Sequence, residues 1–127
     1  MNEIISKRLN NIHYYLEEKG MDCLLVSQAD NRRYLSGFTG SAGALLISRQ
    51  RVILATDFRY VEQAKIQAPL FEVFQTKGEV ANWLPGLVSS QNINSIGFEA
   101  EDIPYAAYIQ LVDAISKGPY FKLVPTQ

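Results

Sequence analysis

The chain has 127 residues, of which 47% are hydrophobic and 20% charged. This length suits one ordinary domain, residues 1–127, and leaves no room for a second full domain. Twelve Lys and Arg residues nearly balance thirteen Asp and Glu residues, and the basic residues are scattered, so nucleic acid is not an expected partner. Because no apolar run approaches the roughly 18 residues of a membrane span, we expect no membrane partner and a cytoplasmic location.

The first elements follow from hydrophobic spacing. Apolar residues three and four positions apart predict a helix over about residues 2–19: Ile5, Leu9, Ile12 and Leu16. Gly20 is expected to end this helix in the left-handed conformation. The apolar run 23–26 then predicts a short buried strand, in which Cys23 is an inert apolar residue.

A brief helical turn and a hairpin are expected next. Asp30 is a candidate N-cap for a turn that Gly37 ends. The apolar runs 43–48 and 52–56 are joined by the three polar residues 49–51, which predicts an antiparallel hairpin. The sheet is therefore expected to be mixed.

Asp57 is a candidate N-cap for a helix that ends before Pro69, with an apolar face made by Tyr60, Val61, Ala64 and Ala68. A strand is expected over residues 71–74. The next helical pattern, over residues 80–88, contains Pro85, which removes a backbone hydrogen bond. We therefore expect a kink there, or two short helical pieces.

A strand over residues 96–99, a helix opened by Pro104 and ended by Gly118, and a last strand over residues 121–124 complete the pattern. The inward face of this last helix is predicted to contain Tyr108, Leu111, Val112 and Ile115. The element order predicts an α/β fold: a three-layer sandwich with a mixed sheet of about six strands and helices on both faces.

The sequence lacks the usual combinations of catalytic residues. A binuclear metal site needs several carboxylates and at least one imidazole, but His13 is the sole histidine and has no His or Glu four residues away. A Ser or Cys nucleophile would have to use the same imidazole as its base. The glycine-rich residues 37–43 lack the lysine of a phosphate-binding loop and lead into a strand. We therefore expect no catalytic residue and no metal ligand in this segment.

Two stretches combine charges, turn glycines and aromatic residues outside any amphipathic period. The first, residues 31–40, reads Asn-Arg-Arg-Tyr-Leu-Ser-Gly-Phe-Thr-Gly, and the second, residues 56–64, reads Thr-Asp-Phe-Arg-Tyr-Val-Glu-Gln-Ala. With the leading helix and the segment Ile96-Gly97-Phe98-Glu99, they resemble the amino-terminal domain of the creatinase/prolidase/aminopeptidase P family. The resemblance is greatest to bacterial Xaa-Pro dipeptidases and Xaa-Pro aminopeptidases.

In that family the amino-terminal domain is not catalytic. The resemblance implies a parent metallopeptidase that hydrolyses peptide bonds to proline with two divalent metal ions, often manganese, in a carboxy-terminal pita-bread domain outside this chain. It also implies that this segment shapes the active site and contributes oligomer contacts. The partners are then its own catalytic domain, proline-containing peptides as substrate, and a second subunit in a homodimer.

The resemblance further suggests which residues face a substrate or partner: Asn31, Arg32, Tyr34, Phe38, Thr39, Asp57, Arg59 and Tyr60. Residue chemistry leaves other interpretations open. Asp57 can cap a helix, and Arg59 can form an ion pair or cover apolar surface with its stem. The arginines, including Arg33, can offer planar forks to a substrate carboxylate. The glycines of residues 37–43 permit tight turns, and the same loop can be shaped for partner contact.

Two other functions are also considered. The first is a freestanding peptide- or protein-binding module, related to pita-bread proteins that have lost catalysis. The second is a small independent enzyme, which requires turnover by these 127 residues alone. A continuation of the gene past Gln127 into spaced Asp, His and Glu ligands is the observation that favours the accessory domain.

Overall fold

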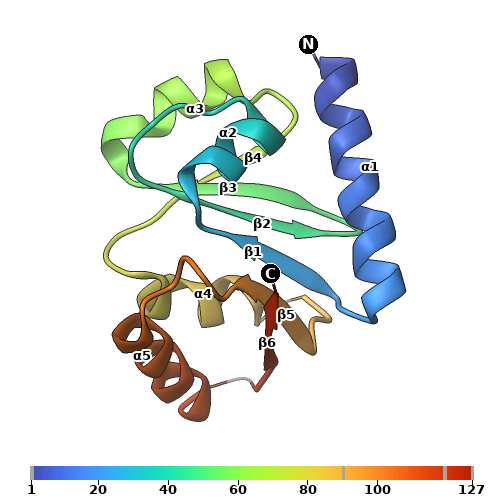
Figure 1. The fold of residues 1–127 in the computed structure, drawn as a ribbon. Coiled ribbons are helices and arrows are strands. Elements are labelled where there is room, and N and C mark those ends of the chain that lie inside the picture. Colours follow the sequence, from blue (N-terminus) through green and yellow to red (C-terminus); the bar gives the residue numbers. More distant parts are fainter. Residues whose placement is uncertain (1, 90, 119, 127) are drawn as a thin grey trace.

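A computed structural model describes residues 2–89, 91–118 and 120–126 and shows one mixed sheet with helices on both faces (Figure 1). The strand order is β4-β3-β2-β1-β5-β6. The strands are β1 Cys23–Val26, β2 Ala44–Ser48, β3 Val52–Thr56, β4 Glu72–Gln75, β5 Ser95–Glu99 and β6 Lys122–Thr126. The expected fold class, a six-stranded α/β sandwich with a hairpin, is confirmed.

Helices α1, α2 and α3 pack on one face of the sheet, and α4 and α5 pack on the other. Their bounds are α1 Asn2–Lys19, α2 Ala29–Ser36, the 3-10 turn η1 Phe58–Tyr60, α3 Val61–Gln67, α4 Val80–Val88 and α5 Tyr105–Ser116. The first helix ends as expected, with Gly20 at a φ of 69°. None of the described helices is both long and apolar enough to cross a membrane.

Strand direction decides where the loops gather. Strand β2 pairs antiparallel with β1 and β3, whereas the β1–β5, β5–β6 and β3–β4 pairs are parallel. The carboxyl ends of β1, β3, β4, β5 and β6 therefore lie at one edge of the sheet, together with the amino end of β2. In open α/β sheets this is the edge where binding sites are usually built.

The sheet separates two apolar cores. Successive residues of a strand point to opposite faces, so Leu45 belongs to the core beneath α1 to α3 and Leu46 to the core beneath α4 and α5. Both side chains are buried, which explains why the strands appear in the sequence as unbroken apolar runs. Cys23 is buried in the core beneath α4 and α5, and this burial raises the pKa of its thiol to about 12. This agrees with its expected inertness.

Two local expectations are corrected by the structure. Helix α2 is capped by Gln28, whose side chain accepts a hydrogen bond from the Asn31 amide, and not by Asp30. The reason is that α2 already begins at residue 29, which places Asp30 in its first turn. Val112 was expected to face inward but is 39% exposed, because α5 turns Leu111 toward the sheet.

For α4, where a kink or two short pieces were expected, the structure has one helix with Pro85 inside it and not two separate pieces. Leu84 and Val88 lie four residues apart on the same side of this helix, and both are buried in the second core. Their packing is the stabilising contact that keeps the segment helical despite the missing backbone donor. Trp83 beside them is partly buried against the same core.

Candidate functional site: an anchored loop at the carboxyl edge of the sheet

The hairpin brings the two signature stretches to the same edge of the sheet. The loop of residues 37–43 leads into β2, and the second stretch begins at the end of β3. Because β2 and β3 are antiparallel, with Ala44 opposite Ala55, the start of β2 lies beside the end of β3. Two segments separated by the whole hairpin therefore come into direct contact.

Residues of the second stretch hold the 37–43 loop by its backbone and side chains. The hydroxyl of Thr56 donates to the carbonyl oxygen of Ala42 at 2.7 Å. The hydroxyls of Ser41 and Tyr60 share a hydrogen bond at 2.5 Å. The Tyr60 ring also meets the Phe38 ring edge-on, with centroids 6.2 Å apart.

Two glutamines of α3 complete the attachment at Thr39. The amide of Thr39 donates to Oε1 of Gln67 at 2.9 Å, and Nε2 of Gln67 donates back to the Thr39 hydroxyl at 3.0 Å. Nε2 of Gln63 donates to the same hydroxyl at 3.2 Å. Neither glutamine is among the eight candidates, although their spacing of four residues places them on one side of a helix.

Two glycines of the loop have clear conformational reasons. Gly37 has a φ of 87° and ends α2, its amide donating to the Arg33 carbonyl at 2.8 Å. A Cβ atom at Gly40 would lie 2.2 Å from Cζ of Phe38, so only glycine lets the loop cross this buried ring. The expected role in tight turning is confirmed for Gly37, whereas Gly40 is required by its close approach to the Phe38 ring.

Arg32 holds the loop from beneath. Its side chain is buried, with Nη1 donating to the Ser27 carbonyl at 2.5 Å and Nη2 donating to the Gly40 carbonyl at 3.3 Å. Burial lowers the pKa of this guanidinium, and the carboxylates of Asp102 and Glu99 oppose that shift. Its Nε has no hydrogen-bond partner among the described residues. Arg32 thus lies under the surface of this domain and bonds to backbone carbonyls.

The other two candidates on α2 lie apart from the loop contacts. The Asn31 side-chain amide donates to Glu99, whose other carboxylate oxygen accepts from the Ser27 and Gln28 amides. Tyr34 is exposed, with the guanidinium of Arg8 3.9 Å from its ring centroid. Asn31 therefore ties the start of α2 to the end of β5, while Tyr34 meets α1.

Asp57, which is partly buried, and Arg59, which is exposed, form a charged pair at the start of η1. Asp57 caps this turn by accepting from the Arg59 amide at 3.0 Å, and its carboxylate also bonds Nε and Nη2 of Arg59. The hydrogen bonds from Arg59 lower the pKa of Asp57. The expected ion pair is confirmed, and the expected cap is present on the 3-10 turn that precedes α3 and not on α3 itself. Between them Phe58, an aromatic residue outside the eight candidates, is 74% exposed.

A hollow of about 320 Å³ lies beside Asp57 on the face of α4 and α5. Its walls include the loop residues Ala42 and Gly43, the end of β3, and residues 78–81, which lead into α4. The Asp57 carboxylate therefore stands at the border between this hollow and the anchored loop.

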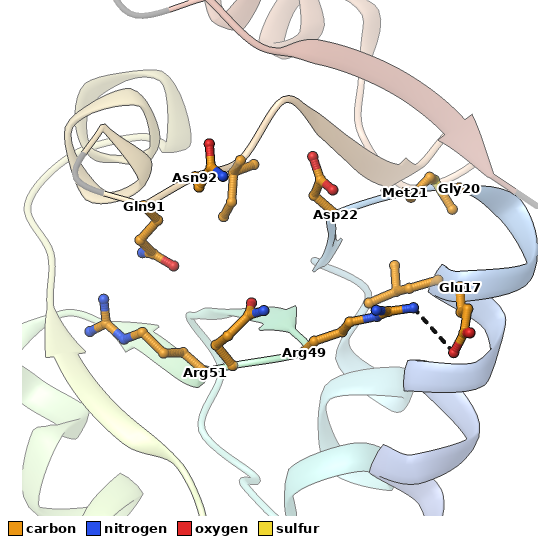
Figure 2. Close-up of a pocket in the computed structure, with 11 residues that line it drawn as sticks. Glu17, Gly20, Met21, Asp22, Arg49, Arg51, Gln91 and Asn92 are labelled. Carbon is orange, nitrogen blue, oxygen red and sulfur yellow. Dashed lines mark ion pairs between the residues drawn. The ribbon is translucent and has the colours of Figure 1, made fainter.

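A larger hollow, of about 650 Å³, lies at the opposite edge of the sheet (Figure 2). Arg49 on its lower side pairs with Glu17 at 3.1 Å, and Arg51 pairs with Glu72 at 2.8 Å. Both arginines are thus already engaged by carboxylates of this domain. Since none of the eight candidates lines it, we place the candidate site at the carboxyl edge.

The structure thus brings five candidates together, which are Phe38, Thr39, Asp57, Arg59 and Tyr60. Of these, Phe38 is buried and supports the loop through its ring. As substrate- or partner-facing residues the eight positions remain predictions. The described residues hold no group of three or more His, Cys, Asp or Glu side chains suited to a metal ion. The described residues therefore do not form a site for the two metal ions, which the resemblance assigns to the catalytic domain.

Comparison with known proteins agrees with this architecture. The family model of the Creatinase/Prolidase N-terminal domain matches residues 8–127. The chain therefore belongs to the creatinase/prolidase amino-terminal domain family. A curated relative, an uncharacterized peptidase YqhT of Bacillus subtilis, is 36% identical over 118 residues. That match covers 93% of this chain and 33% of the relative, so the chain spans about a third of its length.

Two solved structures are similar throughout the domain. A Xaa-Pro dipeptidase from Bacillus anthracis superimposes with a TM-score of 0.87 and 33% identity, over 97% of this chain and 34% of that one. The N-terminal domain of the cytoplasmic peptidase PepQ from Mycobacterium tuberculosis superimposes with a TM-score of 0.86 and 34% identity. That alignment covers 95% of this chain and 93% of the other, so a similar domain has been crystallised alone.

Proposed function

We propose that this chain is the non-catalytic amino-terminal domain of a cytoplasmic Xaa-Pro dipeptidase or aminopeptidase, and that it shapes the active site and contributes oligomer contacts. The observation that carries the proposal is the family match over residues 8–127, together with the anchored loop at the edge of the sheet. In this proposal the catalytic domain binds two divalent metal ions, which we expect to be manganese.

The geometry of the loop supports this role. A peptide bond to proline lacks the usual amide N–H, so selecting for it requires a closed, shaped pocket in place of backbone pairing. A wall of such a pocket works best when it is rigid before the substrate arrives. The 37–43 loop meets this requirement because Arg32, Thr56, Tyr60 and the α3 glutamines hold it.

The parent gene gives the first test. We expect its reading frame to continue past Gln127 into a domain with spaced Asp, His and Glu ligands. In that full protein, Thr39→Val and Tyr60→Phe should lower kcat/KM on a Xaa-Pro substrate about tenfold, because each loosens the loop. The control is Ile66→Ala on the exposed side of α3, which should leave kcat/KM unchanged. A frame that closes at Gln127, or unchanged kinetics in both loop variants, contradicts the proposal.

Experiments on the isolated chain distinguish the accessory domain from the two alternative functions. With added manganese and a Xaa-Pro dipeptide, the 127 residues should give a flat progress curve. Calorimetric titration with a proline-containing peptide should likewise show no binding, because the pocket is completed by the catalytic domain. Turnover would instead favour an independent enzyme, and measurable affinity without turnover would favour a freestanding binding module.

A further inference from the structure

A single peptide group connects the end of β5 to the buried Arg32. The amide of Gln28 donates to Oε1 of Glu99 at 2.8 Å. The carbonyl of Ser27, which belongs to the same peptide group, accepts from Nη1 of Arg32 at 2.5 Å. This peptide group is therefore bonded to a carboxylate at its N–H and to a guanidinium at its C=O. Because both charges polarise the peptide in the same sense, each hydrogen bond strengthens the other.

A second carboxylate reaches Arg32 through Ser27. The Ser27 hydroxyl donates to Oδ2 of Asp102 at 2.6 Å, and the Ser27 amide donates to Oε1 of Glu99 at 2.6 Å. The N–H, the O–H and the C=O of this serine thus bond to Glu99, Asp102 and Arg32 respectively. Ser27 therefore links the two carboxylates that follow β5 to a side chain of α2.

The guanidinium of Arg32 needs these carboxylates because it is buried. Arg32 is 6% exposed. Burial lowers its pKa, and the charges of Asp102 and Glu99 oppose that shift. A buried charge without compensation is strongly destabilising, and a long arginine side chain avoids this by turning its head group into water. We therefore expect the guanidinium to leave its position when either carboxylate is neutralised.

The position of this guanidinium matters for the 37–43 loop. Nη2 of Arg32 donates to the Gly40 carbonyl at 3.3 Å, where the loop crosses the ring of Phe38. Gly40 is itself buried. A buried carbonyl that loses its donor is costly, so the loop would have to open to let water reach it. The centre of the loop thus depends on Arg32 and on the residues that keep Arg32 in place.

We propose that Glu99 and Asp102 are positioning residues of the 37–43 loop, which they hold at Gly40 through Ser27 and Arg32. Neither carboxylate is among the eight candidates. The proposal rests on the proposed function, in which this loop is a wall of the peptidase pocket. It adds that the wall is held in place from the end of β5, on the far side of α2 from the hairpin contacts of Thr56.

Amide hydrogen exchange in the 127-residue chain tests the positioning role without a substrate. The reporter is the buried amide of Phe38 at the start of the loop. Glu99→Gln and Asp102→Asn should each speed its exchange at least about tenfold, because the loop opens more often when Arg32 is released. Glu101→Gln is the matched control, since it removes an exposed charge from the same turn, and it should leave the exchange unchanged.

Two comparisons distinguish positioning from a general loss of stability. The amide of Leu46, in a strand paired on both sides, should change less than the amide of Phe38. In an Arg32→Met background, Glu99→Gln should have no further effect at Phe38, because the carboxylate acts through the guanidinium. Equal effects at both amides, or an undiminished effect in Arg32→Met, overturn the proposal.

Asp102→Asn decides the question if Arg32→Met does not fold. This variant leaves the hydrogen bonds of Glu99 to the start of α2 in place. Unchanged exchange at Phe38 in Asp102→Asn then overturns the proposal, and faster exchange at Phe38 than at Leu46 supports it.

The full-length peptidase tests the use of the loop. Glu99→Gln and Asp102→Asn should lower kcat/KM on a Xaa-Pro substrate about tenfold, whereas Glu101→Gln should not. Unchanged exchange at Phe38 overturns the positioning role and leaves the peptidase assignment unaffected. Faster exchange with unchanged kcat/KM instead supports the positioning role and contradicts the part of the loop in the active site.

Discussion

At the scale of single residues, the candidate site depends on contacts that link distant positions of the chain. Phe38 lies under Gly40, and its ring leaves no space for a side chain there. Tyr60 contacts both the ring and the loop above it. The loop conformation is therefore determined by close packing as well as by hydrogen bonds.

Gly40→Ala should destabilise the domain by about 1–3 kcal/mol, because the new methyl group overlaps the Phe38 ring. The measurement is the midpoint of urea unfolding. Gly86→Ala is the matched control, since nothing lies within 4 Å of a Cβ at that helical position. It should stabilise the domain by about 0.5–1 kcal/mol. Equal effects of the two substitutions would refute the packing argument.

The Asp57–Arg59 pair predicts how the carboxyl group of Asp57 titrates in the folded domain. Because Arg59 lowers the pKa of Asp57 in the folded state, the pair stabilises the fold above the ordinary pKa of an aspartate, and this contribution is lost as the pH falls through the lowered value. NMR titration of the Asp57 side-chain carbon should show a midpoint below the usual range, and Arg59→Gln should raise it. An unchanged midpoint in Arg59→Gln would show that the pair does not persist in solution.

At the scale of elements, α4 shows a conflict between local propensity and packing. Pro85 opposes a helix interior, yet Leu84 and Val88 have to face the second core together. The helix persists because burying these two side chains outweighs one missing hydrogen bond.

Pro85→Ala should therefore stabilise the domain, by up to about 3 kcal/mol, since it restores the donor and leaves the buried residues in place. The change in the free energy of unfolding is measured by thermal unfolding at a series of urea concentrations. Pro69→Ala is the control, because Pro69 lies in a turn after α3, where no helical bond is recovered. A loss of stability in Pro85→Ala would mean that the proline ring itself contributes needed packing.

At the scale of the whole molecule, one sheet is shared by two cores. Leu45 and Leu46 are neighbours in β2 but belong to different cores. Damage to either core therefore loosens the same central strands, and the domain is expected to unfold as one unit.

Leu45→Ala and Leu46→Ala should each cost about 2–5 kcal/mol, because each leaves a cavity at a fully buried site. Circular dichroism and Trp83 fluorescence should give coincident unfolding curves for both variants. If Leu45→Ala unfolded in two steps, with Trp83 reporting only the second, the two cores would be independent.

Local sequence was sufficient to predict most elements and the hairpin, because helical spacing, glycine stops and apolar runs act over only a few residues. It also predicted the Asp57 cap, whose partner is the amide two residues on. The resemblance to the family likewise rested on short, contiguous motifs.

Tertiary structure decided the roles that depend on distant neighbours. Arg32 is buried because the Gly40 carbonyl passes above it, and Asn31 is bound because β5 ends with Glu99 beside α2. Val112 is exposed because α5 rotates Leu111 onto the sheet. Spacing along a helix shows which residues share a face, but only packing against the rest of the chain determines which face is buried.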